Sequence, residues 1–247
     1  NGETLLAISG YNVIGFRVIN TQSEIVKREK HWSSIEYLHW VDLDGDNNDE
    51  LLASSYRYWS EFMVYNSDLS KRWEVLSWDY FDSAQAIQSP DGENFCIAVN
   101  SAGVYFYGPD GELKRIIRNM DTDNWFEEVA PYFDNKSKTL YLAMSNGYDE
   151  ISLSTYEGVV LWQDDTYAGY DELEGSSGVW GSILGTPAKQ LVYRSEYDQI
   201  TVATIAGEKI VSPSHRHMDS WNVLERSNEK ALIIITMDET IHAYTVE

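Results

Sequence analysis

Short apolar runs, each followed by a polar turn, recur along the whole chain. The segments after these runs alternate apolar and polar positions, which is typical of β-strands with a buried face. No stretch with the 3.6-residue period of an amphipathic helix competes with them. The runs begin near residues 5, 51, 95, 140, 191 and 232, so successive runs lie 41 to 51 residues apart. The pattern therefore predicts an all-β chain built from a repeat of about 45 residues.

Each repeat contains further strands around its apolar run. A second strand follows every run, as at 61–65, and in five repeats a third strand follows a tight turn, as at 72–76. From the second repeat onward another strand precedes the run, most clearly at 35–41. Four short antiparallel strands recurring at this interval are typical of β-propeller blades. We expect a single β-propeller domain over residues 1–247, with six blades of mostly four antiparallel strands; five or seven blades remain open.

The repeats at the two ends are incomplete. The first lacks an innermost strand and the last lacks an outer strand, and the chain begins at Asn1 rather than at a methionine. We expect either that the two termini share a closing blade or that residues are missing from the N-terminus.

The composition excludes some partners. A net charge of −22 disfavours nucleic acid and anionic membrane surfaces. No apolar run approaches the roughly 20 residues that a membrane-spanning helix needs, so we expect no membrane insertion. The only cysteine, Cys96, lies in an apolar run, which predicts an inert core thiol rather than a nucleophile.

Residues 41–52 carry the chain's most distinctive chemistry. Acidic side chains alternate around Gly45 between two predicted strands, and such crowding of like charges is unfavourable without a cation. Calcium takes six to eight oxygen ligands, so acids converging in one turn suit it. An EF-hand is rejected because its glycine is at position six and its closing glutamate at position twelve, between helices. A solvated acidic turn without metal is the alternative. The candidate ligands are Asp42, Asp44, Asp46, Asn48 through its backbone carbonyl, and Glu50.

This loop resembles the calcium loop of FG-GAP/VCBS-type repeats, the propeller repeats of integrin α-subunits and many secreted bacterial proteins. The resemblance covers about eleven residues closely and the rest only in general. It implies calcium and recognition rather than a fixed chemistry. Loops of this kind need roughly millimolar calcium, which favours a secreted or periplasmic location. Residues 158–162 also resemble PQQ-like and BamB-like propeller repeats more loosely.

The corresponding turns of the other repeats keep no three alternating acids, so the sequence predicts one calcium ion with a structural role. The connections that leave the opposite ends of the strands are rich in aromatic residues, which stack on sugars or contact protein partners. The candidate ligand-binding residues there are Tyr58, Trp59, Tyr148, Tyr197, His215 and His217.

The function that these features favour is a calcium-stabilised binding module for carbohydrate or protein. A polysaccharide lyase or glycoside hydrolase using His215, His217 and Arg57 is the enzymatic alternative. An assembly scaffold similar to BamB is the third reading. Fold alone does not decide among them.

Overall fold

The computed structural model describes most of the chain. The described residues are 4–10, 13–55, 60–77, 81, 83–88, 94–118, 126–146, 150–165, 179–186, 188–195, 199–212, 218–224, 226, 229–237 and 240–246. They form β-strands and turns with no helix, which confirms the all-β prediction, and they hold no helix long and apolar enough to cross a membrane. The chain divides into two compact units, Asn1–Trp125 and Phe126–Glu247, which are described separately. The single domain expected over residues 1–247 stays a prediction.

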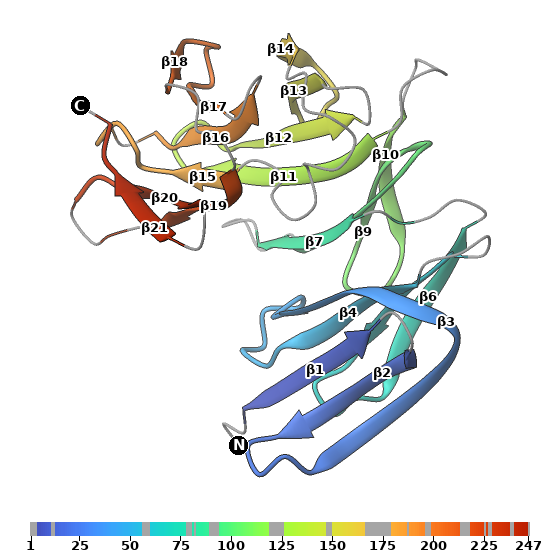
Figure 1. The fold of residues 1–247 in the computed structure, drawn as a ribbon. Helices are drawn as coiled ribbons and strands as arrows, with labels where there is room; N and C mark the ends of the chain where they lie inside the picture. Colours follow the sequence, from blue (N-terminus) through green and yellow to red (C-terminus); the bar gives the residue numbers. More distant parts are fainter. Residues whose placement is uncertain are drawn as a thin grey trace. The chain divides into compact units, whose positions relative to one another are not determined.

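The N-terminal unit contains two sheets (blue to green in Figure 1). The longest strand, β3, pairs with β2 through its first part, as in Val18↔Lys27, and with β4 through its last part, as in Leu38↔Ala53. It therefore joins the group β1–β3 to the four-stranded group β3–β6. The second sheet has the order β10-β9-β8-β7. The strands are β1 Leu5–Gly10, β2 Val13–Asn20, β3 Ile25–Val41, β4 Glu50–Ser55, β5 Ser60–Tyr65, β6 Lys71–Ser77, β7 Ser83–Gln88, β8 Asn94–Asn100, β9 Gly103–Tyr107 and β10 Leu113–Arg118.

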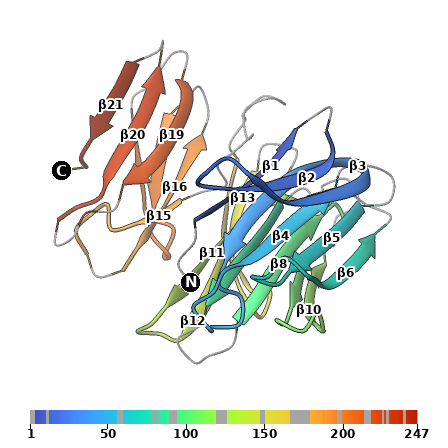
Figure 2. The same ribbon diagram turned by 90° about the horizontal axis from the view of Figure 1, so that it is seen from below.

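The C-terminal unit contains three antiparallel sheets. Two of them have four strands, β11-β12-β13-β14 and β15-β16-β17-β18, and in the described residues the last has three, β19-β20-β21. Figures 1 and 2 both show β19, β20 and β21 side by side. The strands are β11 Phe126–Asp134, β12 Thr139–Asn146, β13 Glu150–Thr155, β14 Val160–Asp165, β15 Val179–Gly181, β16 Gln190–Ser195, β17 Gln199–Ala203, β18 Lys209–Val211, β19 Met218–Leu224, β20 Leu232–Met237 and β21 Thr240–Tyr244.

One turn recurs before the outer strand of five strand groups. In each, the N–H of the fourth residue donates to the carbonyl of the first, and the N–H of the first donates to the carbonyl of the fifth, at 2.7 to 3.0 Å. The fourth residue has a positive φ, as in a type I turn followed by a bulge. Three of the five have glycine there, since only glycine adopts this conformation without cost. The turns begin at Asn20, Asn66, Gly108, Thr155 and Thr204, and their fourth residues are Ser23, Leu69, Gly111, Gly158 and Gly207.

Burial falls from the centre of each four-stranded group to its outer strand. Every residue of β4 and β16 is buried, whereas β6 and β10 contain no buried residue and β18 is entirely exposed. Contiguous apolar runs form the second strands because both of their faces are covered. Four apolar clusters of the described residues each join two neighbouring sheets or strand groups of one unit. The order of exposure is therefore that of packed propeller blades.

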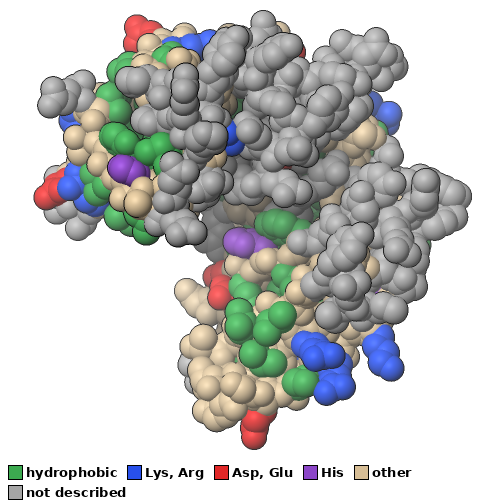
Figure 3. Space-filling view, in the orientation of Figure 1, with side chains coloured by type: hydrophobic (Ala, Val, Ile, Leu, Met, Phe, Trp, Pro, Cys, Tyr) green, Lys and Arg blue, Asp and Glu red, His purple; other side chains and the backbone are tan. Residues whose placement is uncertain are grey.

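The cysteine prediction is confirmed. Cys96 on β8 is fully buried beside Phe62 and Phe81, and burial raises the pKa of its thiol. It packs as a small apolar residue. Elsewhere the N-terminal unit leaves apolar side chains exposed, among them Leu6 and Val26, and Figure 3 shows such side chains beside Lys and Arg on the face in view.

Candidate metal centre

The acidic segment is the connection between β3 and β4, as the sequence predicts. Val41 pairs with Glu50, so the two strands meet directly below the loop. Leu43, which is 1% exposed, anchors the loop in the core shared by β3–β5 and β7–β9. Gly45 and Asn47 both adopt positive φ, at 80° and 66°, which turns the chain sharply. The exposed polar side chains of residues 44–49 are thereby held above a fixed apolar base.

Three of the predicted ligands converge. Carboxylate oxygens of Asp42, Asp44 and Glu50 all lie within 4.8 Å of one another. Calcium–oxygen distances are about 2.3–2.6 Å, so two oxygens on one ion are at most about 5 Å apart. The donor set is made of oxygen alone, which is the chemistry that calcium and magnesium prefer over softer metals. The geometry and chemistry of this cluster therefore fit calcium.

The loop backbone donates to all three of these carboxylates, and the N–H of Asp46 reaches Oδ1 of Asp44 at 3.3 Å. The N–H groups of Gly45 and Asn47 donate to Oδ1 and Oδ2 of Asp42 at 2.7 and 3.0 Å. The N–H of Leu43 donates to Oε2 of Glu50 at 2.9 Å. The three acids are thus oriented by backbone donors rather than by side-chain packing alone.

Glu50 is the buried member of the cluster, with 2% of its surface exposed. Burial is the largest influence on this carboxyl and raises its pKa above the ordinary value, while the Leu43 N–H opposes the shift. The neighbouring charges act in both directions: Asp44 raises the pKa and Arg72 lowers it. A buried carboxylate of this kind is costly unless a cation compensates it.

The structure supplies one such cation that the sequence pattern does not reveal. Nη1 of Arg72, on β6, lies 2.8 Å from Oδ2 of Asp44 and 3.8 Å from Oε1 of Glu50. Arg72 is 28 residues from Asp44 in the sequence, and only the pairing of β4 with β5 and β5 with β6 brings it to the loop. No local motif could have indicated this contact.

Asp46 is not part of the cluster formed by the other three acids. Oδ1 of Asp46 accepts hydrogen bonds from the backbone N–H and the side-chain amide of Asn48, at 2.7 and 3.1 Å. Both residues are exposed. Their roles as ligands, Asp46 through its carboxylate and Asn48 through its carbonyl, stay predictions.

The predicted ligand-binding side chains lie outside the described residues. The β3–β4 loop and the recurrent turns lie at one end of the strands in each four-stranded group. The connections that would carry the predicted binding residues leave the strands at the other end. Two aromatic residues of innermost strands, Trp180 on β15 and Trp221 on β19, are buried, and Trp180 Nε1 donates to the Ala130 carbonyl at 3.0 Å. Those two are packing residues. The side chains outside the description are Tyr58, Trp59, Tyr148, Tyr197, His215 and His217.

No protein-family model matches the chain, and no curated protein matches it. Solved structures do. A crystal structure of BBS1N in complex with ARL6DN is similar with a TM-score of 0.71 at 11% identity, covering 99% of this chain and 74% of that one. Virginiamycin B lyase from Staphylococcus aureus gives 0.61 at 12% identity, covering 100% and 82%. A mitotic checkpoint complex structure gives 0.62 at 12% identity, covering 98% and 71%.

At such low identity these similarities show the fold alone. The sheets, the repeated turn and the matches over nearly the whole chain agree on one architecture, so the chain is a β-propeller protein built from repeats. The number of blades stays a prediction.

Proposed function

We propose that this chain is a β-propeller scaffold that binds a protein partner and carries one structural calcium ion in its β3–β4 loop. The observation that supports the scaffold role is the fold: similar propellers occur in the BBS1N–ARL6DN complex and in the mitotic checkpoint complex. Repeat architectures of this kind present rigid surfaces from which connections reach a partner. Recognition of a carbohydrate by the same connections is the alternative that the aromatic residues allow.

The partner test compares two classes of ligand. The immobilised chain is used to capture proteins from the culture of its source, and each captured protein is purified and titrated by calorimetry; the chain is also applied to a glycan array. The proposal expects a saturable protein complex with a dissociation constant of about 10 µM or lower. Binding to glycans with no saturable protein complex would favour the carbohydrate reading instead.

Variants locate the contact. Tyr148→Ala and Tyr197→Ala remove aromatic side chains from the predicted binding connections, and Tyr156→Ala removes one from a recurrent turn at the other strand ends. The first two are expected to weaken the protein complex at least tenfold, about 1.4 kcal/mol. The third is expected to leave it unchanged. Equal losses in all three would place the contact elsewhere.

The calcium proposal rests on the three converging carboxylates, with Asp42, Asp44 and Glu50 as the residues that would hold the ion. When bound, the ion would neutralise the acids and rigidify the loop. Loops of extracellular modules bind calcium at about 0.1–1 mM, so 10 mM calcium would add about 1.4–2.7 kcal/mol to stability. This affinity range also underlies the proposal of a secreted or periplasmic location.

The melting temperature is measured in calcium and in chelator. The wild-type chain is expected to melt several degrees higher in calcium, and Asp44→Ala to melt at the same temperature in both. Asp68→Ala is the control, since that acid lies in another exposed turn and is expected to leave the calcium response intact. A wild-type chain insensitive to calcium would reject the metal.

A further inference from the structure

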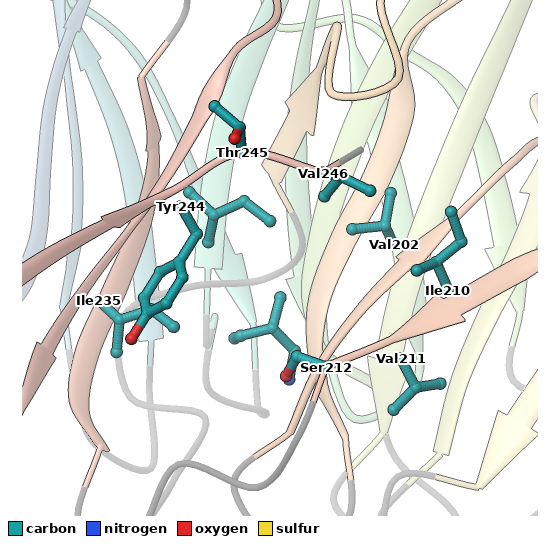
Figure 4. Close-up of a pocket in the computed structure, with 10 residues that line it drawn as sticks. Val202, Ile210, Val211, Ser212, Ile235, Tyr244, Thr245 and Val246 are labelled. Atoms are coloured by element: carbon teal, nitrogen blue, oxygen red, sulfur yellow. The ribbon is translucent and has the colours of Figure 1, made fainter.

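An apolar pocket of 340 Å³ lies between the sheets β15–β18 and β19–β21 of the C-terminal unit. Figure 4 shows the Tyr244 ring on one side and Ile210 with Val202 on the other. Its lining is almost entirely aliphatic or aromatic. The volume lies at the lower end of the range for ligand pockets, which is about 300–1,000 Å³. The residues that line it are Ile200, Val202, Ile210, Val211, Ser212, Ile233, Ile235, Tyr244, Thr245 and Val246.

The pocket residue Ile210 can be compared with the residues at the same place on two other outer strands. Trp73 on β6 pairs with Val64, two residues before a recurrent turn, and Trp162 on β14 pairs with Leu153 at the equivalent place. Ile210 on β18 pairs with Val202, again two residues before such a turn. The three outer-strand residues therefore occupy the same position of the repeat.

Each tryptophan packs against the recurrent turn of the next sheet. The Trp73 ring lies so close to Gly111 that a Cβ there would stand 2.8 Å from its Cγ, and its Nε1 donates to the Pro109 carbonyl at 3.0 Å. Trp162 likewise covers Gly207, where a Cβ would stand 3.2 Å from the ring. An indole thus occupies this position in two of the other repeats, and Lys27 and Arg115 hold it in the remaining two.

In the groove after β18 the occupant is smaller. Ile210 takes the place of tryptophan and remains 43% exposed, and residues Tyr244, Thr245 and Val246 stand opposite it where the next recurrent turn would begin. A branched aliphatic side chain does not reach as far as an indole. The pocket is the space that remains.

β21 lies beside this pocket and is the last strand of its sheet among the described residues. Within the described part of the chain β21 pairs only with β20, and all five of its residues are exposed, Ile241 to 75%. An unpaired strand edge can accept an extended peptide as an added strand. Tyr244 pairs with Ile233 and lines the pocket, so residues of an added strand opposite Tyr244 would face the pocket too.

We propose that an extended peptide segment of the protein partner adds to the edge of β21 and places an aromatic side chain in this pocket. The proposal rests on the scaffold function proposed above and names its recognition mode. The net charge of −22 favours a segment that carries Lys or Arg beside the aromatic residue. Backbone hydrogen bonds would provide strand pairing, and the pocket would select the side chain.

The probe is a peptide with the sequence of β6, Lys-Arg-Trp-Glu-Val-Leu-Ser, labelled with a fluorophore and titrated with the whole chain. Saturable binding is expected, and replacing its tryptophan by alanine should weaken binding at least tenfold. Methylating alternate backbone nitrogens should abolish binding, because an added strand needs those donors. No binding at millimolar chain concentration, or equal binding of the alanine and methylated peptides, would overturn the proposal.

The matched variants are Ile210→Trp and Val160→Trp. Both add an indole to an exposed apolar position of an outer strand in the C-terminal unit, but only Ile210 lines the pocket. Ile210→Trp should fill the pocket, raise the melting temperature and prevent peptide binding, whereas Val160→Trp should leave binding intact. Unchanged binding by Ile210→Trp would overturn the proposal. A dimer in light scattering that Ile210→Trp dissociates would also overturn it, because a second copy would then be the occupant.

These outcomes are separate from those for the scaffold function. A purified partner that still binds Ile210→Trp, while the β6 peptide does not bind the wild-type chain, would leave the scaffold standing and remove only the pocket's role.

Discussion

The loop before β4 and the loop before β16 solve the same structural problem with different side chains. Glu50 and Gln190 are each the first residue of a fully buried strand, and each is 2% exposed. Each accepts a hydrogen bond of 2.9 Å from a backbone N–H of its own loop, Leu43 in one case and Leu184 in the other. A buried aliphatic residue also anchors each loop. It is Leu43 in one loop and Ile183 in the other, and each lies two residues after the end of the preceding strand.

The difference lies in the second polar atom of the side chain. Nε2 of Gln190 donates to Thr186 Oγ1 at 2.8 Å and to the Ala188 carbonyl, so the amide is satisfied inside its loop. Glu50 has only acceptors, and its second oxygen faces Asp44 and Arg72. The neutral amide of Gln190 finds its hydrogen-bond partners within its own loop, whereas the carboxylate of Glu50 needs a cation beside it.

The largest effect is expected for Gln190→Glu. A carboxylate there loses both donors and faces the Ala188 carbonyl, so the urea midpoint should fall by the equivalent of about 3 kcal/mol. Gln22→Glu in the exposed turn after β2 is the control, with a change below about 0.5 kcal/mol. A small effect at Gln190 would mean that the loop does not depend on the amide donors.

An intermediate effect is expected for Arg72→Leu. Without calcium the variant should lose about 1 kcal/mol, because Asp44 and Glu50 lose their guanidinium partner. Its calcium affinity should rise several-fold, because the side chain no longer competes for the same oxygens. Arg118→Leu, on exposed β10, controls for the loss of one positive charge. Calcium affinity that stays equal or falls in Arg72→Leu would show that the arginine does not compete with the ion.

The sequence predicts more of the fold than of the site. Contiguous apolar runs mark the central strands because both faces of those strands are buried, and β4, β8, β12, β16 and β20 lie where these runs predict them. The turns are visible through their glycines, as at Gly111 and Gly207, although Ser23 and Leu69 adopt the same conformation with no such signal. Leu69 is 8% exposed, so its packing explains why glycine is absent there.

The contacts that decide the site depend on pairing between distant strands. Alternation in residues 42–50 indicates the acids, but the guanidinium of Arg72 reaches them only through two strand pairings. The sequence does not indicate the role of Gln190 either, since a glutamine before an apolar run is common. The sequence does not reveal the pocket at Ile210 either. It is recognised only when the strand register shows that Ile210 is equivalent to Trp73 and Trp162.

The most direct test of the cation requirement is Glu50→Gln, examined by calorimetric calcium titration and by melting in chelator. The variant should bind no calcium and should melt in chelator within a few degrees of the wild-type chain, since glutamine keeps the Leu43 acceptor and removes the buried charge. The wild-type chain should bind one calcium ion. A variant that still binds calcium as the wild type does would contradict the account.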